Sequence, residues 1–510
     1  MTNNPIPETA VPVTPAPEKR FASVSTRDFV YLAIAAVLSL CIGNAVYGGG
    51  MQGGFAIGAV ALLTAALLYL GKNMRVTVLS VASLTASYAI LASFLLYENT
   101  AFSFFKFNFL FLALAIFFVS AYGIQAPSMD DFRALLSPCY LFFGETARAM
   151  PLTVRSFGKK NASFGKKVGM VLLALILALP LLAVLTVLLA SADQAFEGFV
   201  ENIDFDASEL IVTLTLGIGV LLCVFPLLIA IRKKELQMKA STHKPYLSCL
   251  DGTIVSTVLF SVALLYLVFL VTQLSYLVGG FAGLLPEDYT YADYARRGFF
   301  EMFLICLLNL GTIFVADVFV KRKEEKIPPF ARALELFICL FSLFLIGSAF
   351  AKMFLYIRTY GLTFLRLGTS IFMVLLAVVF VSLIVRSFMP RFPAMRVALV
   401  TACALLTVFS LAEPYKIIVD YNMYRYSAEA AKGNTDAIDI YYVAYDCGSY
   451  GVEALTELAA SPDEGIADLA KERLDNLRRH ATYKVGGKDL RGESLSHMQA
   501  CKALEKYYAE

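Results

Sequence analysis

The chain has 510 residues, of which 58% are hydrophobic and only 16% are charged, with a formal net charge of +3. A soluble globular chain carries about a quarter charged residues, so this composition argues against a soluble protein. Apolar runs of span length recur along the chain, and in lipid the backbone must satisfy its own hydrogen bonds, which favours helices over barrel strands. We therefore expect an all-α fold, that of a polytopic helical membrane protein.

The predicted elements fall into three regions. Residues 1–26 are polar and rich in Pro, which predicts a disordered N-terminal tail. Residues 27–413 form the predicted transmembrane helical domain, and residues 414–510 a small extracytoplasmic helical domain. About eleven spans are expected. They are Phe29–Tyr47, Phe55–Leu70, Val76–Tyr97, Phe102–Tyr122, Val168–Ser191, Leu210–Ile231, Thr253–Leu277, Phe299–Phe319, Ala333–Ile357, Phe364–Ile384 and Val397–Leu411.

The charges in the loops predict the orientation. Lys and Arg gather in every second connection, whereas the connection Ala192–Glu209 carries only acidic charges. Basic residues favour the cytoplasmic side, so we expect a cytoplasmic N-terminus and an extracytoplasmic C-terminus after eleven crossings.

The polar C-terminal region has apolar residues at helical spacing, with one stripe at Val452, Leu455 and Leu458 and another at Leu469, Leu474 and Leu477. About four short helices are expected. They fit a fragment of a helical-repeat array that presents a surface to a protein partner, and equally a cap packed on the spans. Cys447 and Cys501 both lie in this region, where an oxidising envelope would permit a disulfide; we predict that they do not form one.

Two stretches break the charge pattern on the predicted outer side. In the first, AKMFLYIRTYGLTFLR, the side chains of Lys352, Tyr356 and Tyr360 share one helical face. The second is the tyrosine- and arginine-rich run Tyr289–Glu301. We hypothesise an outer-facing polar pocket for an anionic ligand or a lipid headgroup; the alternative is a structural network that locks two spans together. The candidate binding residues are Tyr291, Tyr294, Arg296, Arg297, Glu301, Lys352, Tyr356, Arg358, Tyr360 and Arg366.

These two stretches also carry a resemblance. YTYADYARRGFFE before one span and SAFAKMFLYIRTYGLTFLR in the next resemble a bacterial family of polytopic membrane proteins, catalogued as domain of unknown function 4173. The resemblance extends to a polar tail with an Asn-x-x-Arg start, here Asn422 and Arg425. It implies a bacterial inner-membrane location and carries no established activity.

Among classes of function, an enzyme has the least support, because no catalytic, nucleotide-binding or metal-binding motif stands in a fitting context. No cofactor, metal or nucleic acid is expected, and membrane lipids are the expected neighbours. A transporter or lipid flippase is the alternative, with Asn309, Gln273 and Lys352 as candidate path residues; the other interpretation of Asn309 is a hydrogen bond to a neighbouring helix. A non-enzymatic signalling, sensing or envelope-associated protein is the function that we favour.

Overall fold

The structure is a computed structural model that describes residues 25–71, 74–98, 100–123, 140–157, 185, 207–233, 250–281, 299–319, 328–432, 438–479 and 493–509. The regular elements of these residues are helices. They are α1 (Thr26–Gly49), α2 (Gly53–Leu70), α3 (Val78–Leu96), α4 (Thr100–Tyr122), η2 (Tyr140–Glu145), α6 (Thr146–Phe157), α9 (Ala207–Arg232), α10 (Gly252–Phe281), α12 (Phe299–Phe319), α13 (Pro329–Tyr360), α14 (Phe364–Phe388), α15 (Ala394–Leu411), α16 (Pro414–Ala430), η3 (Tyr442–Asp446), η4 (Gly448–Tyr450), α17 (Gly451–Leu458), α18 (Glu464–Arg479) and α19 (Leu495–Ala509).

Nine helices of the described residues are long and apolar enough to cross a membrane: α1–α4, α9, α10 and α13–α15. Helix α12 contains a shorter apolar segment, Glu301–Ala316. The predicted all-α polytopic membrane fold is thereby confirmed. Ten predicted spans coincide with these nine helices and α12, whereas the predicted span Val168–Ser191, apart from Leu185, lies outside the described residues.

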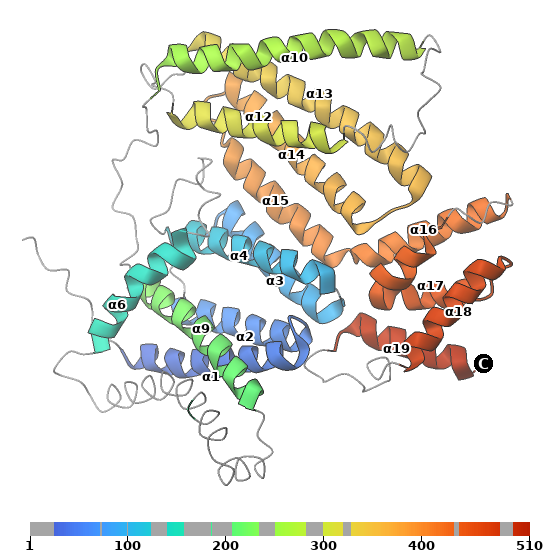
Figure 1. Ribbon diagram of the computed structural model, residues 1–510. Coiled ribbons are helices and arrows are strands. Elements are labelled where there is room, and N and C mark those ends of the chain that lie inside the picture. The colour runs from blue at the N-terminus through green and yellow to red at the C-terminus, as the bar shows by residue number, and fades with distance from the viewer. Residues whose placement is uncertain are drawn as a thin grey trace, which may run out of the picture.

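The spans form two groups that meet at α3 (Figure 1). One apolar core joins α1, α2, α4 and α9, and a second joins α10 and α12–α15. Helix α3 contacts α2 and α4 on one side and α15 on the other. Its buried serines, Ser83, Ser87 and Ser93, donate their hydroxyls to carbonyls of α3 itself, so their burial leaves none of these hydroxyls unpaired.

Helices α1 and α9 cross at two glycines. A Cβ on Gly43 would lie 2.4 Å from the carbonyl oxygen of Thr213, and one on Gly217 would lie 2.9 Å from Cα of Leu40. Only glycine fits at either position, because each backbone fills the space that the other's side chain would need. Such close approach between small residues is a characteristic way for membrane helices to associate.

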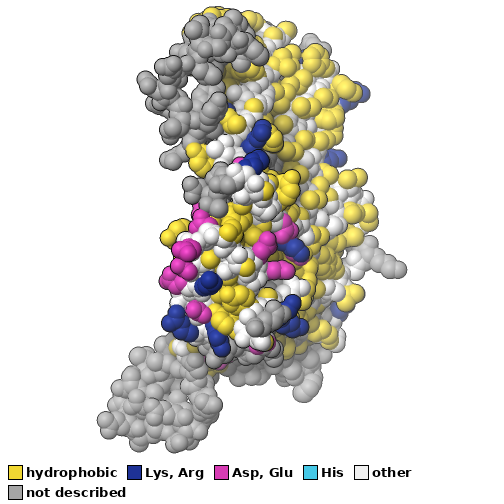
Figure 2. Space-filling model, turned by 90° about the vertical axis from the view of Figure 1, so that its right-hand side faces the viewer, with side chains coloured by type: hydrophobic (Ala, Val, Ile, Leu, Met, Phe, Trp, Pro, Cys, Tyr) yellow, Lys and Arg dark blue, Asp and Glu magenta, His cyan; other side chains and the backbone are white. Residues whose placement is uncertain are grey.

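Helices α16–α19 form a tail domain at one end of the bundle (Figure 1). We call this end of the bundle the tail face. The predicted stripes are largely confirmed: Val452, Leu455, Leu458, Leu474 and Leu477 are buried in one core, and Leu469 packs against it half-buried. Viewed from the tail side, charged side chains gather over this domain, whereas the neighbouring flank is hydrophobic (Figure 2). That contrast is expected of a polar domain beside a lipid-facing bundle.

The tail domain is attached to the spans at two places. At the end of α3, the hydroxyl of Ser449 donates to the carboxylate of Glu98, and the backbone N–H of Glu98 donates to the hydroxyl of Ser496 at 2.8 Å. The second place is the turn between α13 and α14. This turn carries the candidate site.

Candidate functional site at the α13–α14 turn

Helix α13 ends at the tail face because of Gly361. This residue has φ +81°, a conformation that strains residues with a side chain. The next helix starts at once: Thr363 is the N-cap of α14, and its side chain accepts a hydrogen bond from the backbone N–H of Arg366. The turn is therefore short and brings the ends of both spans against the tail domain.

The amide side chain of Asn422, on α16, clamps this turn. The N–H of Leu362 donates to Oδ1 of Asn422 at 2.8 Å, and Nδ2 of Asn422 donates to the carbonyl oxygen of Leu362 at 2.9 Å. Both residues are buried. Nearby, the N–H of Phe364 donates to the hydroxyl of Tyr442 at 2.8 Å. The tail domain thus satisfies backbone groups that the two helix ends leave unpaired.

Arg366 holds the turn from the other side. Its Nη1 donates to the carbonyl oxygens of Tyr360, at 3.1 Å, and Gly361, at 2.5 Å. The guanidinium lies 4.0 Å from the centroid of the Tyr356 ring, and the rings of Tyr356 and Tyr360 are 5.3 Å apart. Three predicted site residues are therefore in contact: Arg366 lies over the ring of Tyr356 and donates to the backbone of Tyr360.

Arg425 is a second guanidinium at the same turn. A Cβ on Gly361 would lie 2.9 Å from its Nη1. Burial lowers the pKa of Arg425, and the nearby positive charge of Arg366 lowers it further, whereas Tyr421 and Glu429 oppose these effects. No carboxylate of the described residues forms a salt bridge with Arg366 or Arg425. Among the described residues, two neighbouring cations thus share a half-buried position with no carboxylate at salt-bridge distance, while Glu429 acts on Arg425 from further away.

The other predicted site residues are arranged differently. Lys352 on α13 is half-buried and lies within electrostatic range of Glu301, which is exposed on α12. Arg358 is exposed in the last turn of α13, where a cation is favourable to the helix dipole. Tyr291, Tyr294, Arg296 and Arg297 lie outside the described residues.

Comparison with known protein families matches residues 84–458 to the domain of unknown function DUF4153. The chain belongs to the DUF4153 family. The sequence motifs suggested the family numbered 4173, and that assignment was wrong in its number. The curated proteins and the solved structures each gave no match.

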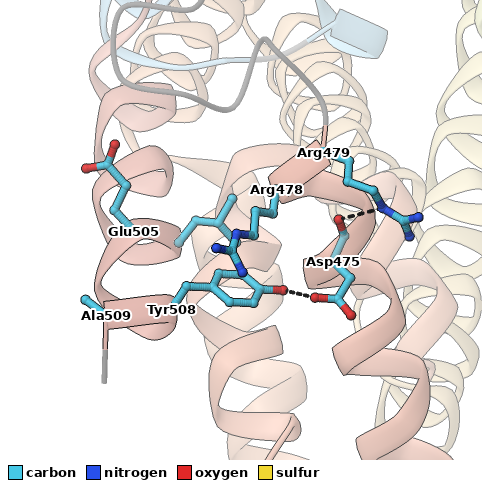
Figure 3. A pocket seen from close by; sticks show the side chains of 7 residues that line it. Asp475, Arg478, Arg479, Glu505, Tyr508 and Ala509 are labelled. Atoms are coloured by element: carbon cyan, nitrogen blue, oxygen red, sulfur yellow. Dashed lines mark hydrogen bonds between the residues drawn. The ribbon is translucent and has the colours of Figure 1, made fainter.

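The DUF4153 region contains the whole α13–α14 turn together with Asn422 and Arg425. A pocket of about 900 Å³ in the tail domain lies beyond it (Figure 3). There the hydroxyl of Tyr508 donates to Asp475, the guanidinium of Arg478 lies 4.2 Å from the centroid of the Tyr508 ring, and Arg479 donates to the side chain of Asn476 at 2.8 Å. These polar groups satisfy one another. The protein partner expected for the tail domain stays a prediction.

Asp28, which the sequence reasoning missed, is a carboxylate buried at the end of the bundle opposite the tail face. It is 1% exposed and accepts hydrogen bonds at 2.6 Å from both the hydroxyl of Tyr69 and Nη1 of Arg232; Nζ of Lys233 lies 4.0 Å away. These contacts join α1, α2 and α9. The residue precedes the matched DUF4153 region. Its sequence signal was the capping pattern Ser25-x-x-Asp28.

Lys106, also missed, lies within the matched DUF4153 region on α4. It is 1% exposed, and its Nζ donates to the carbonyl oxygen of Ser93 at 3.3 Å and lies 5.0 Å from the centroid of the Phe94 ring. A lone lysine in the run FSFFKFNFL was the available signal. These contacts link α4 to α3. Burying a charged lysine within the membrane costs considerable free energy.

Asn309 forms hydrogen bonds with two neighbouring helices. This agrees with one of the two interpretations of the residue from the sequence. The hydroxyl of Tyr266 on α10 donates to Oδ1 of Asn309, and Nδ2 of Asn309 donates to Oγ of Ser342 on α13 at 2.9 Å. The buried amide therefore joins three spans, as polar side chains often do within membrane bundles.

Proposed function

We propose that this protein is a non-enzymatic membrane protein with a sensing, signalling or envelope-associated role, in which an anionic group binds between Arg366 and Arg425. One observation carries the proposal: two guanidinium groups from different helices lie beside the same turn, and no carboxylate of the described residues forms a salt bridge with either. Bringing like charges together in a half-buried position is unfavourable, and an anion between them relieves the repulsion. Arginine forks suit the oxygens of phosphate and carboxylate.

The phosphate of a lipid headgroup or a free phosphate supplies this chemistry. The site's depth favours the lipid, because α16 begins at Pro414, directly after the apolar span that ends at Leu411. An interfacial position of this kind lies at the level of headgroups. The positive-inside distribution of the loop charges supports an extracytoplasmic tail face, so the lipid would belong to the outer leaflet.

The sensing role rests on the clamp at the same turn. Asn422 and Arg425 lie one helical turn apart on α16, and Asn422 holds the backbone of Leu362 through two hydrogen bonds. An anion bound by Arg425 and Arg366 adds a second link between α16 and α14. Occupancy of the site would therefore tighten the contact between spans and tail domain.

The test is calorimetric titration of the full chain in a neutral detergent, with dihexanoyl phosphatidylglycerol in one arm and inorganic phosphate in the other. Arg425→Gln removes one guanidinium. Arg358→Gln is the control: this candidate from the sequence is an exposed arginine in the last turn of α13, outside the proposed site. Hydrogen bonds to charged groups contribute about 1.5–3 kcal/mol, so Arg425→Gln should weaken binding roughly tenfold or more.

Saturable binding of the lipid that Arg425→Gln weakens and Arg358→Gln does not weaken would support the proposal. Binding of inorganic phosphate with the same dependence would assign the free anion as the ligand. Absence of saturable binding in both arms, or equal binding by wild type and Arg425→Gln, would overturn it. Slower amide exchange at residues 361–364 in the bound state would support the sensing role.

A further inference from the structure

Helices η2 and α6 are not among the nine described helices that are long and apolar enough to cross a membrane. Helix α6 lies at the end of the bundle far from the tail face (Figure 1). It contacts α9, and η2 contacts both α4 and α9. Leu141 of η2 and Ala149 of α6 are 0% and 1% exposed, in the core that joins α1, α2, α4 and α9. One side of this short element is therefore fixed against the spans.

The opposite side of the element is an exposed apolar stripe. Phe143 is 76% exposed and Met150 is 37% exposed, and Ala147 and Pro151 are exposed as well. The residues follow one another at intervals of about one helical turn, so they share one face. A contiguous apolar surface of this kind marks a site that contacts lipid or a partner.

The contacts of the neighbouring residue decide between these occupants. The ring of Phe142 packs against the ring of Phe111 on α4, with 4.9 Å between the centroids. Phe111 is 37% exposed and lies about 16 Å before the end of α4 at Tyr122, at 1.5 Å per residue. Half of a hydrocarbon core is about 15 Å thick, so this aromatic contact lies at the depth of acyl chains. The stripe that begins at Phe143 is therefore continuous with the lipid-facing surface of α4, which a soluble partner does not reach.

The charges of the element favour one class of lipid. Arg148, whose side chain is 63% exposed, lies next to the stripe, and its Nη1 donates to Glu145 at 2.7 Å. Helix α6 also carries Arg155 and contains no acidic residue, which leaves the element with a net positive charge. A helix with an apolar face and basic residues binds at the boundary between headgroups and acyl chains, and binds more tightly where the lipids are anionic.

We propose that η2 and the start of α6 bind the lipid leaflet far from the tail domain, with Phe143 among acyl chains and Met150 among anionic headgroups. From Phe143 to Met150 the chain rises about 10 Å at 1.5 Å per residue, which fits the step from acyl chains to headgroups. The element thus enters one leaflet without crossing it. This lipid contact is independent of the site at Arg366 and Arg425, which lies at the other end of the bundle.

The absence of Trp from the sequence allows single tryptophans to report the depth of the stripe. Phe143→Trp and Met150→Trp probe its two ends. Leu265→Trp, at a residue 65% exposed on the span α10, is the control in lipid, and Tyr424→Trp, at a residue 73% exposed on α16, is the control in water. Each variant is reconstituted as the full chain in phosphatidylcholine vesicles whose acyl chains carry bromine either near the headgroup or near the middle of the chain. Bromine quenches the fluorescence of a tryptophan in contact with it.

We expect Phe143→Trp to be quenched to an extent comparable with Leu265→Trp, and Tyr424→Trp to stay unquenched. The ratio of quenching by shallow bromine to quenching by deep bromine should be higher for Met150→Trp than for Phe143→Trp. In mixtures where only one lipid is brominated, Met150→Trp should show a roughly fivefold preference for phosphatidylglycerol over phosphatidylcholine, the factor contributed by one basic residue near an anionic surface. Arg155→Gln removes the net charge while Glu145 keeps its partner, and it should abolish this preference.

Quenching of Phe143→Trp as weak as that of Tyr424→Trp would overturn the proposal, because the stripe would then face water or protein. Equal depth ratios for Phe143→Trp and Met150→Trp would overturn it too, since the element would not pass from acyl chains to headgroups. Equal quenching of Met150→Trp by brominated phosphatidylglycerol and brominated phosphatidylcholine would contradict the assignment of anionic lipid.

Discussion

Replacing Asn422 with alanine tests whether the tail domain is held to the spans by the amide clamp. The substitution removes two hydrogen bonds, of 2.8 and 2.9 Å, to the backbone of Leu362. Each such bond contributes about 1 kcal/mol net, and a buried group left unsatisfied costs about 1–3 kcal/mol. Since Leu362 is buried, we expect the turn to lose about 2–4 kcal/mol of local stability.

Hydrogen–deuterium exchange of the full chain in detergent measures this loss at the N–H of Leu362 itself. A loss of 2–4 kcal/mol corresponds to exchange faster by a factor of roughly 30 to 1,000. Asn422→Asp is the graded control, because a carboxylate still accepts from the N–H but cannot donate to the carbonyl oxygen. Exchange in the α1–α9 crossing should stay the same in both variants. Unchanged exchange at Leu362 in Asn422→Ala would refute the clamp.

Three further predictions concern stability and thiol chemistry. Gly361→Ala should open the same turn, because its Cβ would lie 2.6 Å from Oδ1 of Asn422 at a φ of +81°; limited proteolysis should then release the tail domain faster, and an unchanged rate would contradict the close contact. Asp28→Asn should destabilise the α1–α2–α9 group by about 2–4 kcal/mol, because it leaves Arg232 without its buried partner; a melting temperature equal to wild type would count against this. Burial raises the pKa of the Cys447 thiol to about 12. At pH 8 its thiolate fraction is therefore roughly a thousandfold lower than that of a thiol with the ordinary pKa of about 9. Alkylation should be slow until the chain unfolds, and the stabilising contribution of the neutral thiol, complete below about pH 9, should disappear as the pH rises towards 12.

The spans were predictable because their signal is local. Length and continuous hydropathy decide whether a segment crosses a bilayer, and α13 and α14 therefore lie where the sequence placed them. The helix starts were less predictable. Ser461 followed by Pro462 is typical of a helix that starts at the proline. Helix α18 instead begins at Glu464, because the carboxylate of Asp463 accepts from the N–H groups of Gly465 and Ile466.

The candidate site was predictable only in its parts. Gly361 and Asn422 each stood in a motif, but 60 residues separate Leu362 from Asn422, and no local pattern shows that the amide pairs with that backbone. Arg366 looked like a free ligand for an anion, whereas part of its guanidinium is used by two carbonyls and a tyrosine ring. The pairing of Arg366 with Arg425 depends on the fold of α16 against α14, which the sequence does not encode locally.

The ion pair of Asp28 also sets the order of assembly during synthesis. Its partner Arg232 lies 204 residues further along the chain, so at 5–20 residues per second the ribosome delivers the cation roughly 10–40 s after the carboxylate. During that interval Asp28 can accept from the hydroxyl of Tyr69 on α2 but lacks the guanidinium of Arg232, and the glycine crossing with α9 cannot close. The first two helices are therefore synthesised well before the group can close, and α9 completes it.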